Sequence, residues 1–186
     1  TMEIIFLLFG KMPLYDAICT SLGTAGTGGF GIKNDSFCSY NVYLQWVVTI
    51  FMILFGVNFN AYYLLLFGHI REALKVEEVR YYFSIIIASV VVISVNIAHM
   101  CTGVFDAVTK AAFQVGSIIT TTGFSSTDFD RWPELSKTLL VLLMFIGACA
   151  GSTGGGIKVS RIVIAVKTIR KELNGYIHPK LSLIHI

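Results

Sequence analysis

Charged residues are scarce in this chain of 186 residues. Only 13% of the residues are charged, 55% are hydrophobic, and the mean hydropathy is +0.74. A soluble domain carries about 25% charged residues, so this chain lacks the side chains that cover a solvated surface. Several apolar runs reach the roughly 20 residues that cross a bilayer as a helix. The scarcity of charge therefore excludes an ordinary soluble domain and predicts an all-α integral membrane protein.

The few cysteines form no pattern that carries metal or redox chemistry. The four cysteines, Cys19, Cys38, Cys101 and Cys149, include no CxxC pair and have no histidine at metal-ligand spacing. A disulfide between Cys38 and Cys101 stays an open alternative, because both could lie on one side of the membrane. The sequence therefore predicts no cofactor and no transition metal. A net charge of +3, with clustered positive residues, points to membrane orientation and not to nucleic acid.

The beginning of the chain lacks a signal-peptide pattern. Thr1 stands where an initiator methionine would, and Met2–Phe9 is only half a membrane span, with no basic region before it and no cleavage site after it. Residues 181–186 (LSLIHI) match the translation of a common sequencing-library adapter. We therefore expect an N-terminally truncated fragment of a longer gene in which residues 181–186 are an artefact.

Two copies of a Thr/Gly motif are present instead. One is GTGGFG at residues 26–31, and the other is ITTTGFS at residues 119–125. Each follows a run too short to cross a bilayer, and Asp16 and Asp106 fall in the first turns of these runs, where a carboxylate favours the helix dipole. The pattern predicts re-entrant pore helices, Leu14–Leu22 and a second one that begins about one turn earlier relative to its motif.

Longer apolar segments flank both motifs. Val42–Phe67 and Tyr81–Ile97 are predicted to span the membrane. A third span begins at Leu139–Ala148, breaks at residues 151–156 (GSTGGG) and resumes as Ile157–Ile169. The sequence therefore predicts four parts: a pore repeat over 1–67, a cytoplasmic hairpin over 68–80, a pore repeat over 81–171 with a broken second helix, and a cytoplasmic linker over 172–180. Arg and Lys gather in 69–80 and after Lys158, so those ends are expected in the cytoplasm and both motifs toward the outside.

The two motifs suit the binding of a cation. A loop of glycine and threonine can turn its carbonyls into a narrow path, because glycine reaches positive φ. Rings of carbonyl oxygens replace the hydration shell of potassium. The predicted ion-binding residues are Thr27, Gly28, Gly29, Thr121, Thr122 and Gly123. Asn58 and Asn60 interrupt a predicted span, and the sequence leaves open whether they face the pore or form hydrogen bonds between helices.

These residues resemble those of the TrkH/TrkG–KtrB family of potassium uptake proteins, which is related to the plant HKT transporters. The matching segments are Thr27–Phe30, Thr120–Ser125 with Asp128–Pro133, and Ala150–Lys158. The resemblance implies four fused helix–pore-helix–helix repeats around one potassium-channel-like pore, of which this chain holds the second and third. The acidic, aromatic segment after the second motif favours the Trk-type branch.

The resemblance also implies roles. The glycine before each phenylalanine contributes to the selectivity filter, although Gly28 and Gly29 compete for that role in the first motif. Residues Gly151, Ser152, Thr153, Gly154, Gly155 and Gly156, here named the Gly-rich loop, correspond to a gate below the filter. The resemblance further implies a multi-pass protein of the bacterial inner membrane, a homodimer, and a cytoplasmic nucleotide-binding ring of the TrkA/KtrA type as partner.

Other interpretations of the Gly-rich loop compete. A phosphate-binding loop needs Gly-Lys-Ser/Thr in succession, but Ile157 separates Gly156 from Lys158. An intramembrane serine protease would use Ser152, but the histidines lie at span ends or in a basic tail and Gly-x-Ser-x-Gly is absent. A simple helix kink remains an alternative. A subunit of a tetrameric potassium channel is disfavoured, because tetramers use one filter copy four times.

Overall fold

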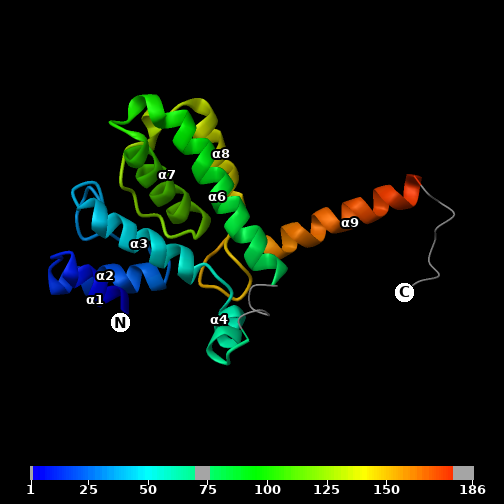
Figure 1. Ribbon diagram of the computed structural model, residues 1–186, viewed down its shortest axis with the longest axis horizontal. Helices are drawn as coiled ribbons and strands as arrows, with labels where there is room; N and C mark the ends of the chain where they lie inside the picture. The colour runs from blue at the N-terminus through cyan, green and yellow to red at the C-terminus, as the bar shows by residue number, and fades with distance from the viewer. Residues whose placement is uncertain (1, 70–75, 178–186) are drawn as a thin grey trace.

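The computed structural model describes residues 2–69 and 76–177, and this part of the chain is helical (Figure 1). Its only strand-like pairing is an isolated bridge between Ile146 and Ile157. The helices are α1 (Met2–Phe9), α2 (Leu14–Ala25), α3 (Val42–Phe55), α4 (Phe59–Leu66), α6 (Glu77–Ile97), η1 (Ala98–Met100), α7 (Val104–Ile119), η2 (Phe129–Arg131), α8 (Glu134–Phe145) and α9 (Val159–Ile177). An all-α fold is confirmed.

Helices α1, α2 and α3 pack together as one unit. Lys11 has a positive φ of 62° and reverses the chain after α1, and Pro13 precedes the first turn of α2, where its missing N–H is not needed. The predicted pore helix is present and ends at Ala25, beyond the predicted Leu22. Asp16 lies in its first turn, as predicted.

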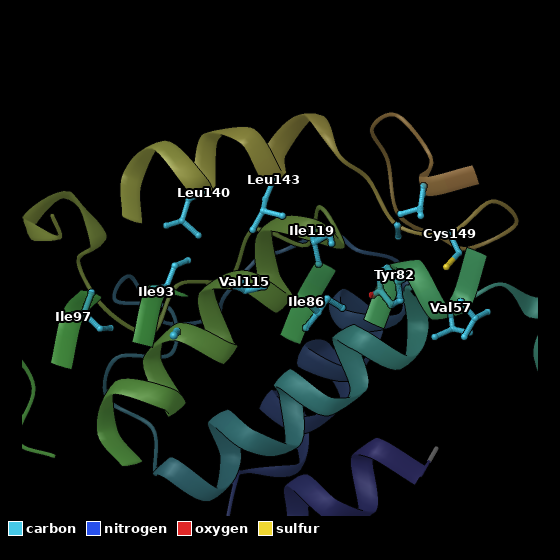
Figure 2. Packing of buried hydrophobic residues seen from close by; sticks show 14 of the residues in the cluster. Val57, Tyr82, Ile86, Ile93, Ile97, Val115, Ile119, Leu140, Leu143 and Cys149 are labelled. Atoms are coloured by element: carbon cyan, nitrogen blue, oxygen red, sulfur yellow. The ribbon is translucent and has the colours of Figure 1, made fainter. Parts of the chain in front are cut away.

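Helices α6, α7 and α8 form the second unit. The pore helix α7 has 16 residues against 12 in α2, which confirms the prediction of an additional turn. Figure 2 shows side chains of α6 pointing toward α7 and α8. Ile86, Ile93, Val115, Leu140 and Leu143 are buried in this cluster. Close packing of this kind holds membrane helices together, because lipid tails are as apolar as the helices.

The two units meet along α3 and α7. The ring of Phe37 lies 5.5 Å from that of Phe113 and 4.9 Å from that of Phe124. The indole N–H of Trp46 donates to the Thr109 hydroxyl at 3.1 Å. Aromatic packing and a polar contact therefore fix the two repeats side by side.

The predicted span Val42–Phe67 is wrong as a continuous helix. It forms α3 and α4, which meet at an angle of 93°. Gly56 lies at the bend, where a Cβ would stand 2.2 Å from the Tyr82 hydroxyl, and the Asn58 side chain accepts from the Asn60 N–H to start α4. Among the described residues, Glu77–Met100 alone has the length and hydropathy to cross a membrane, and the bent pair would be a second span if counted as one.

The charged hairpin predicted over 68–80 is partly helical. Helix α6 begins at Glu77, before the predicted Tyr81, so Glu77 to Arg80 form its first turn. Residues 70–75 lie outside the described residues. The first turn of α6 therefore carries two carboxylates, Glu77 and Glu78, next to the Gly-rich loop.

The predicted break in the third span is present but wider than expected. Helix α8 ends at Phe145 and α9 begins at Val159. The Gly147 N–H donates to the Ile157 carbonyl at 2.8 Å, which ties the two sides of the break together. Helix α9 continues through Ile177, into the segment 172–180 predicted as a linker, and residues 178–186 lie outside the described part.

Candidate functional site

The two Thr/Gly loops leave their pore helices in the same way. The Gly28 N–H donates to the Gly23 carbonyl at 2.8 Å, and the Thr122 N–H donates to the Ser117 carbonyl at 2.9 Å. Such bonds satisfy the last carbonyls of a helix and require a left-handed residue just before, usually glycine. That residue is a threonine in both loops. Thr27 has a φ of 49° and Thr121 a φ of 58°.

The next left-handed residue settles how the two motifs correspond. Gly29 has a φ of 64° and Gly123 a φ of 88°, while Gly28 and Thr122 between them have negative φ. Gly29 is therefore the structural counterpart of Gly123. Positive φ at a β-branched residue costs about 1–3 kcal/mol and persists only where its surroundings enforce it. The sequence analysis assigned positive φ to glycine in these loops, and the structure adds the two threonines, Thr27 and Thr121.

The two loops contact each other directly. A Cβ on Gly29 would lie 1.9 Å from the Thr122 carbonyl oxygen, so the backbones meet where no side chain fits. The Phe37 N–H donates to the Ser125 carbonyl at 2.8 Å, and the Ser125 N–H donates to the Ser36 hydroxyl at 3.1 Å. The structure thus brings together the predicted ion-binding residues of both motifs.

The 119–125 loop is braced by hydroxyls that the 26–31 loop lacks. The buried Ser117 hydroxyl donates to the Phe124 carbonyl at 2.6 Å, and the Thr120 and Thr122 hydroxyls lie 2.8 Å apart. In the earlier repeat, Gly23 occupies the position of Ser117, as the matching helix-end bonds show. The two loops share a backbone conformation but not their side-chain support.

Ser117→Ala is expected to destabilise this loop. The change leaves the buried Phe124 carbonyl without its hydroxyl donor and should lower the free energy of unfolding by about 1–3 kcal/mol. Thermal unfolding of the detergent-solubilised protein measures the loss. Ser84→Ala is the matched control, because the exposed Ser84 hydroxyl bonds only the Arg80 carbonyl of its own helix, and its effect should stay within about 0.5 kcal/mol. Equal effects of the two substitutions would contradict the bracing role.

The Gly-rich loop lies against both Thr/Gly loops. The Thr27 hydroxyl donates to the Thr153 carbonyl at 3.2 Å, and the Gly155 N–H donates to the Thr121 hydroxyl at 2.7 Å. The two left-handed threonines therefore each form a hydrogen bond with the Gly-rich loop. A Cβ on Gly154 would lie 2.8 Å from the Ala148 Cβ and 3.0 Å from the Thr120 carbonyl oxygen, which leaves room only for glycine.

The start of the Gly-rich loop is tied to the bend between α3 and α4. The Cys149 N–H donates to the Gly56 carbonyl at 3.0 Å, and the Phe59 N–H donates to the Gly151 carbonyl at 3.2 Å. The Ser152 hydroxyl donates to the Cys149 carbonyl at 2.7 Å. The bend, which replaces the predicted continuous span, therefore supports the backbone of the Gly-rich loop, whose polar groups need partners inside a membrane.

Glu78 also belongs to this site, and no sequence motif had indicated a role for it. Its Oε1 accepts from the Ala150 N–H at 2.6 Å and from the Ser160 N–H at 3.2 Å, and its Oε2 accepts from the Asn58 amide at 3.3 Å. Asn58 thus forms the interhelical hydrogen bond that was one of its two alternatives. The Asn60 side chain is exposed in the first turn of α4. The only sequence feature that could have indicated this role is the position of an acidic residue at the start of an apolar helix.

The described part of the chain holds no cluster of three histidine, cysteine or acidic residues that could bind a metal. The four cysteines are free, so the alternative of a Cys38–Cys101 disulfide does not apply to this structure. Burial, followed by the nearby Asp35 charge, raises the pKa of the Cys38 thiol. Cys38 therefore stays in its less reactive protonated form.

Paired pore helices with touching Thr/Gly loops define the fold class as an all-α membrane protein built from pore-helix repeats. The chain belongs to the TrkH family, described as cation transport proteins, which it matches over residues 7–84 and 82–186. It is 34% identical to the Trk system potassium uptake protein TrkH of Salmonella typhimurium over 180 residues, and 32% identical to TrkG of Escherichia coli over 177 residues.

The fold also matches a solved structure of this family. The crystal structure of the potassium transporter TrkH from Vibrio parahaemolyticus superposes with a TM-score of 0.92 at 30% identity, over 98% of this chain and 40% of that one. The aligned region covers 93% of this chain and 37% of the Salmonella protein, and 92% of this chain and 36% of the Escherichia coli protein. The chain therefore spans less than half the length of these relatives.

Proposed function

We propose that the chain forms the second and third of four repeats around a potassium-selective pore. In this proposal Thr27 to Gly29 and Thr121 to Gly123 line the ion path with backbone carbonyls, and potassium is the transported substrate. The observation that carries the proposal is the pair of bonds from Thr27 and Thr121 to the Gly-rich loop. They put a loop without regular structure directly beside both candidate filter loops, as a gate requires.

Two further observations support this assignment. The relatives named above are potassium uptake proteins, which favours transport over catalysis. The contact between Gly29 and the Thr122 carbonyl joins two different filter loops within one chain. That arrangement favours fused repeats over a tetramer of identical subunits, in which neighbouring loops come from separate chains.

The proposed location is the bacterial inner membrane, with several spans and both Thr/Gly loops toward the outside. The exposed part of α9 carries Arg161, Lys167, Arg170 and Lys171, which favours the cytoplasmic side. By family resemblance, the complete protein forms a homodimer and binds a cytoplasmic nucleotide-binding ring. In this proposal the basic helix α9 is the part of this chain that contacts the ring.

Gly123→Ser is expected to lower the selectivity for potassium over sodium. A Cβ on Gly123 meets no atom of the described residues within 4 Å, but its φ of 88° strains any side-chain-bearing residue. Strain of about 1–3 kcal/mol at the candidate filter should reduce the ratio of potassium to sodium uptake by roughly tenfold. The measurement is ion uptake by cells that lack other potassium uptake systems and express the complete protein.

Gly103→Ser provides the control for this substitution. Gly103 also has open space around its Cβ position, but its backbone is extended, with a φ of −177°, and it caps α7, where serine is favourable. Its selectivity should equal that of the wild type. If Gly123→Ser also retained normal selectivity at normal expression, the filter assignment would be lost.

A further inference from the structure

Three separate segments converge on the carboxylate of Glu78. Oxygen Oε1 bonds Ala150, which precedes the Gly-rich loop, and Ser160, which follows it. Oxygen Oε2 bonds Asn58 at the bend between α3 and α4. One side chain on α6 therefore joins both ends of the Gly-rich loop to the segment that supports it.

A carboxylate suits the groups that surround it. Ser160 lies in the first turn of α9, where backbone N–H groups have no partner within the helix. The partial positive charge of a helix start favours an anion at this point. Ala150 contributes a further backbone N–H from the irregular segment before the loop. Glu78 thus supplies from another helix the cap that α9 would otherwise take from its own sequence.

We propose that Glu78 is a positioning residue that holds the Gly-rich loop against Thr27 and Thr121. This inference rests on the proposed gate function of that loop. Because a single oxygen bonds Ala150 before the loop and Ser160 at the start of α9 after it, the separation of these flanking residues is fixed while the carboxylate is in place. Loss of the carboxylate frees both ends together, and the loop then leaves the filter threonines.

Cys149 provides a native reporter of this movement. Its side chain is 0% exposed, and it directly precedes Ala150. In the complete protein, with the other cysteines replaced by alanine, a water-soluble maleimide should label Cys149 slowly. Glu78→Ala should increase the labelling rate by about tenfold, since it removes hydrogen bonds to a charged group. Glu78→Gln keeps one acceptor oxygen and should give an intermediate labelling rate. This variant replaces Glu78→Ala in the test if the alanine variant fails to accumulate.

Glu77→Ala is the matched control. Glu77 lies in the same turn of α6, but its carboxylate pairs with the exposed Lys167 on α9 and not with the Gly-rich loop. Its labelling rate should equal that of the wild type. Equal labelling of Cys149 in the Glu78 and Glu77 variants would overturn the role of Glu78, whatever the function of the loop.

Ion flux separates this inference from the proposed function. Glu78→Ala should raise basal potassium flux without changing the ratio of potassium to sodium uptake. In a protein that already lacks Gly154 and Gly155, Glu78→Ala should cause no further increase in flux, because Glu78 acts through the loop. If the deletion raises flux but Glu78→Ala does not, the inference fails and the gate stands. If Cys149 labelling rises but neither change raises flux, the gate fails and Glu78 remains an anchor of the loop.

Discussion

Gly29→Ala is expected to reduce potassium uptake by roughly a hundredfold, whereas Gly28→Ala should leave it nearly unchanged. At Gly29 a Cβ would lie 1.9 Å from the Thr122 carbonyl oxygen and 2.9 Å from its carbon, and the φ of 64° is unfavourable for alanine. At Gly28 the nearest atom, on the Phe30 ring, lies at an ordinary 3.6 Å. The same small change therefore displaces the proposed filter at one position and is accommodated at its neighbour.

Potassium uptake of the two alanine variants, measured at matched expression in the complete protein, tests this prediction. Thr122 occupies the position of Gly28 in the other loop, so a side chain is compatible with this backbone. If Gly28→Ala were the damaging change, the carbonyl path would run one residue earlier than the backbone conformation indicates.

Deleting Gly154 and Gly155 is expected to raise potassium flux by about tenfold in the absence of any regulator. The deletion removes the N–H that donates to the Thr121 hydroxyl and the carbonyl to which the Lys158 side chain donates. Loss of two such bonds, one of them to a charged group, corresponds to at least one power of ten in the equilibrium between loop positions. The shortened loop no longer reaches the filter threonines and leaves the path open.

Initial rates of rubidium or potassium uptake in vesicles measure this flux. Ser84→Ala is the control, since its exposed hydroxyl bonds only the Arg80 carbonyl of its own helix and touches neither the Gly-rich loop nor the Thr/Gly loops. Its flux should match that of the wild type. A fall in flux on deletion, at normal expression, would instead support a structural kink at this position.

Short-range features of the chain could be predicted because they depend on neighbouring residues. Pore helices α2 and α7 follow from short apolar runs with an acidic first turn, and the additional turn of α7 follows from the position of Asp106. The break after α8 follows from residues 151–156, because six small residues cannot sustain a helix in lipid. Scarce charge and apolar runs decide the all-α membrane class.

Long-range contacts decided what the sequence could not. Gly56 lies at a 93° bend, and the Tyr82 hydroxyl from another helix occupies the space that a side chain at this position would need. Residues Thr27 and Thr121 hold a conformation usual for glycine because the helix-end bonds and the Gly-rich loop enforce it. The Glu78 carboxylate acquires its partners from segments far away in the chain.

The sequence by itself determined the class of the protein, the two pore helices and the three loops of the candidate site. Only the tertiary structure decided that Gly29, and not Gly28, corresponds to Gly123, and that Glu78 joins both ends of the Gly-rich loop. The physical reason is that periodicity and turn composition act within a few residues, whereas the choice between two adjacent glycines depends on which backbone approaches from the other repeat. That approach, to the Thr122 carbonyl, exists only in the folded chain.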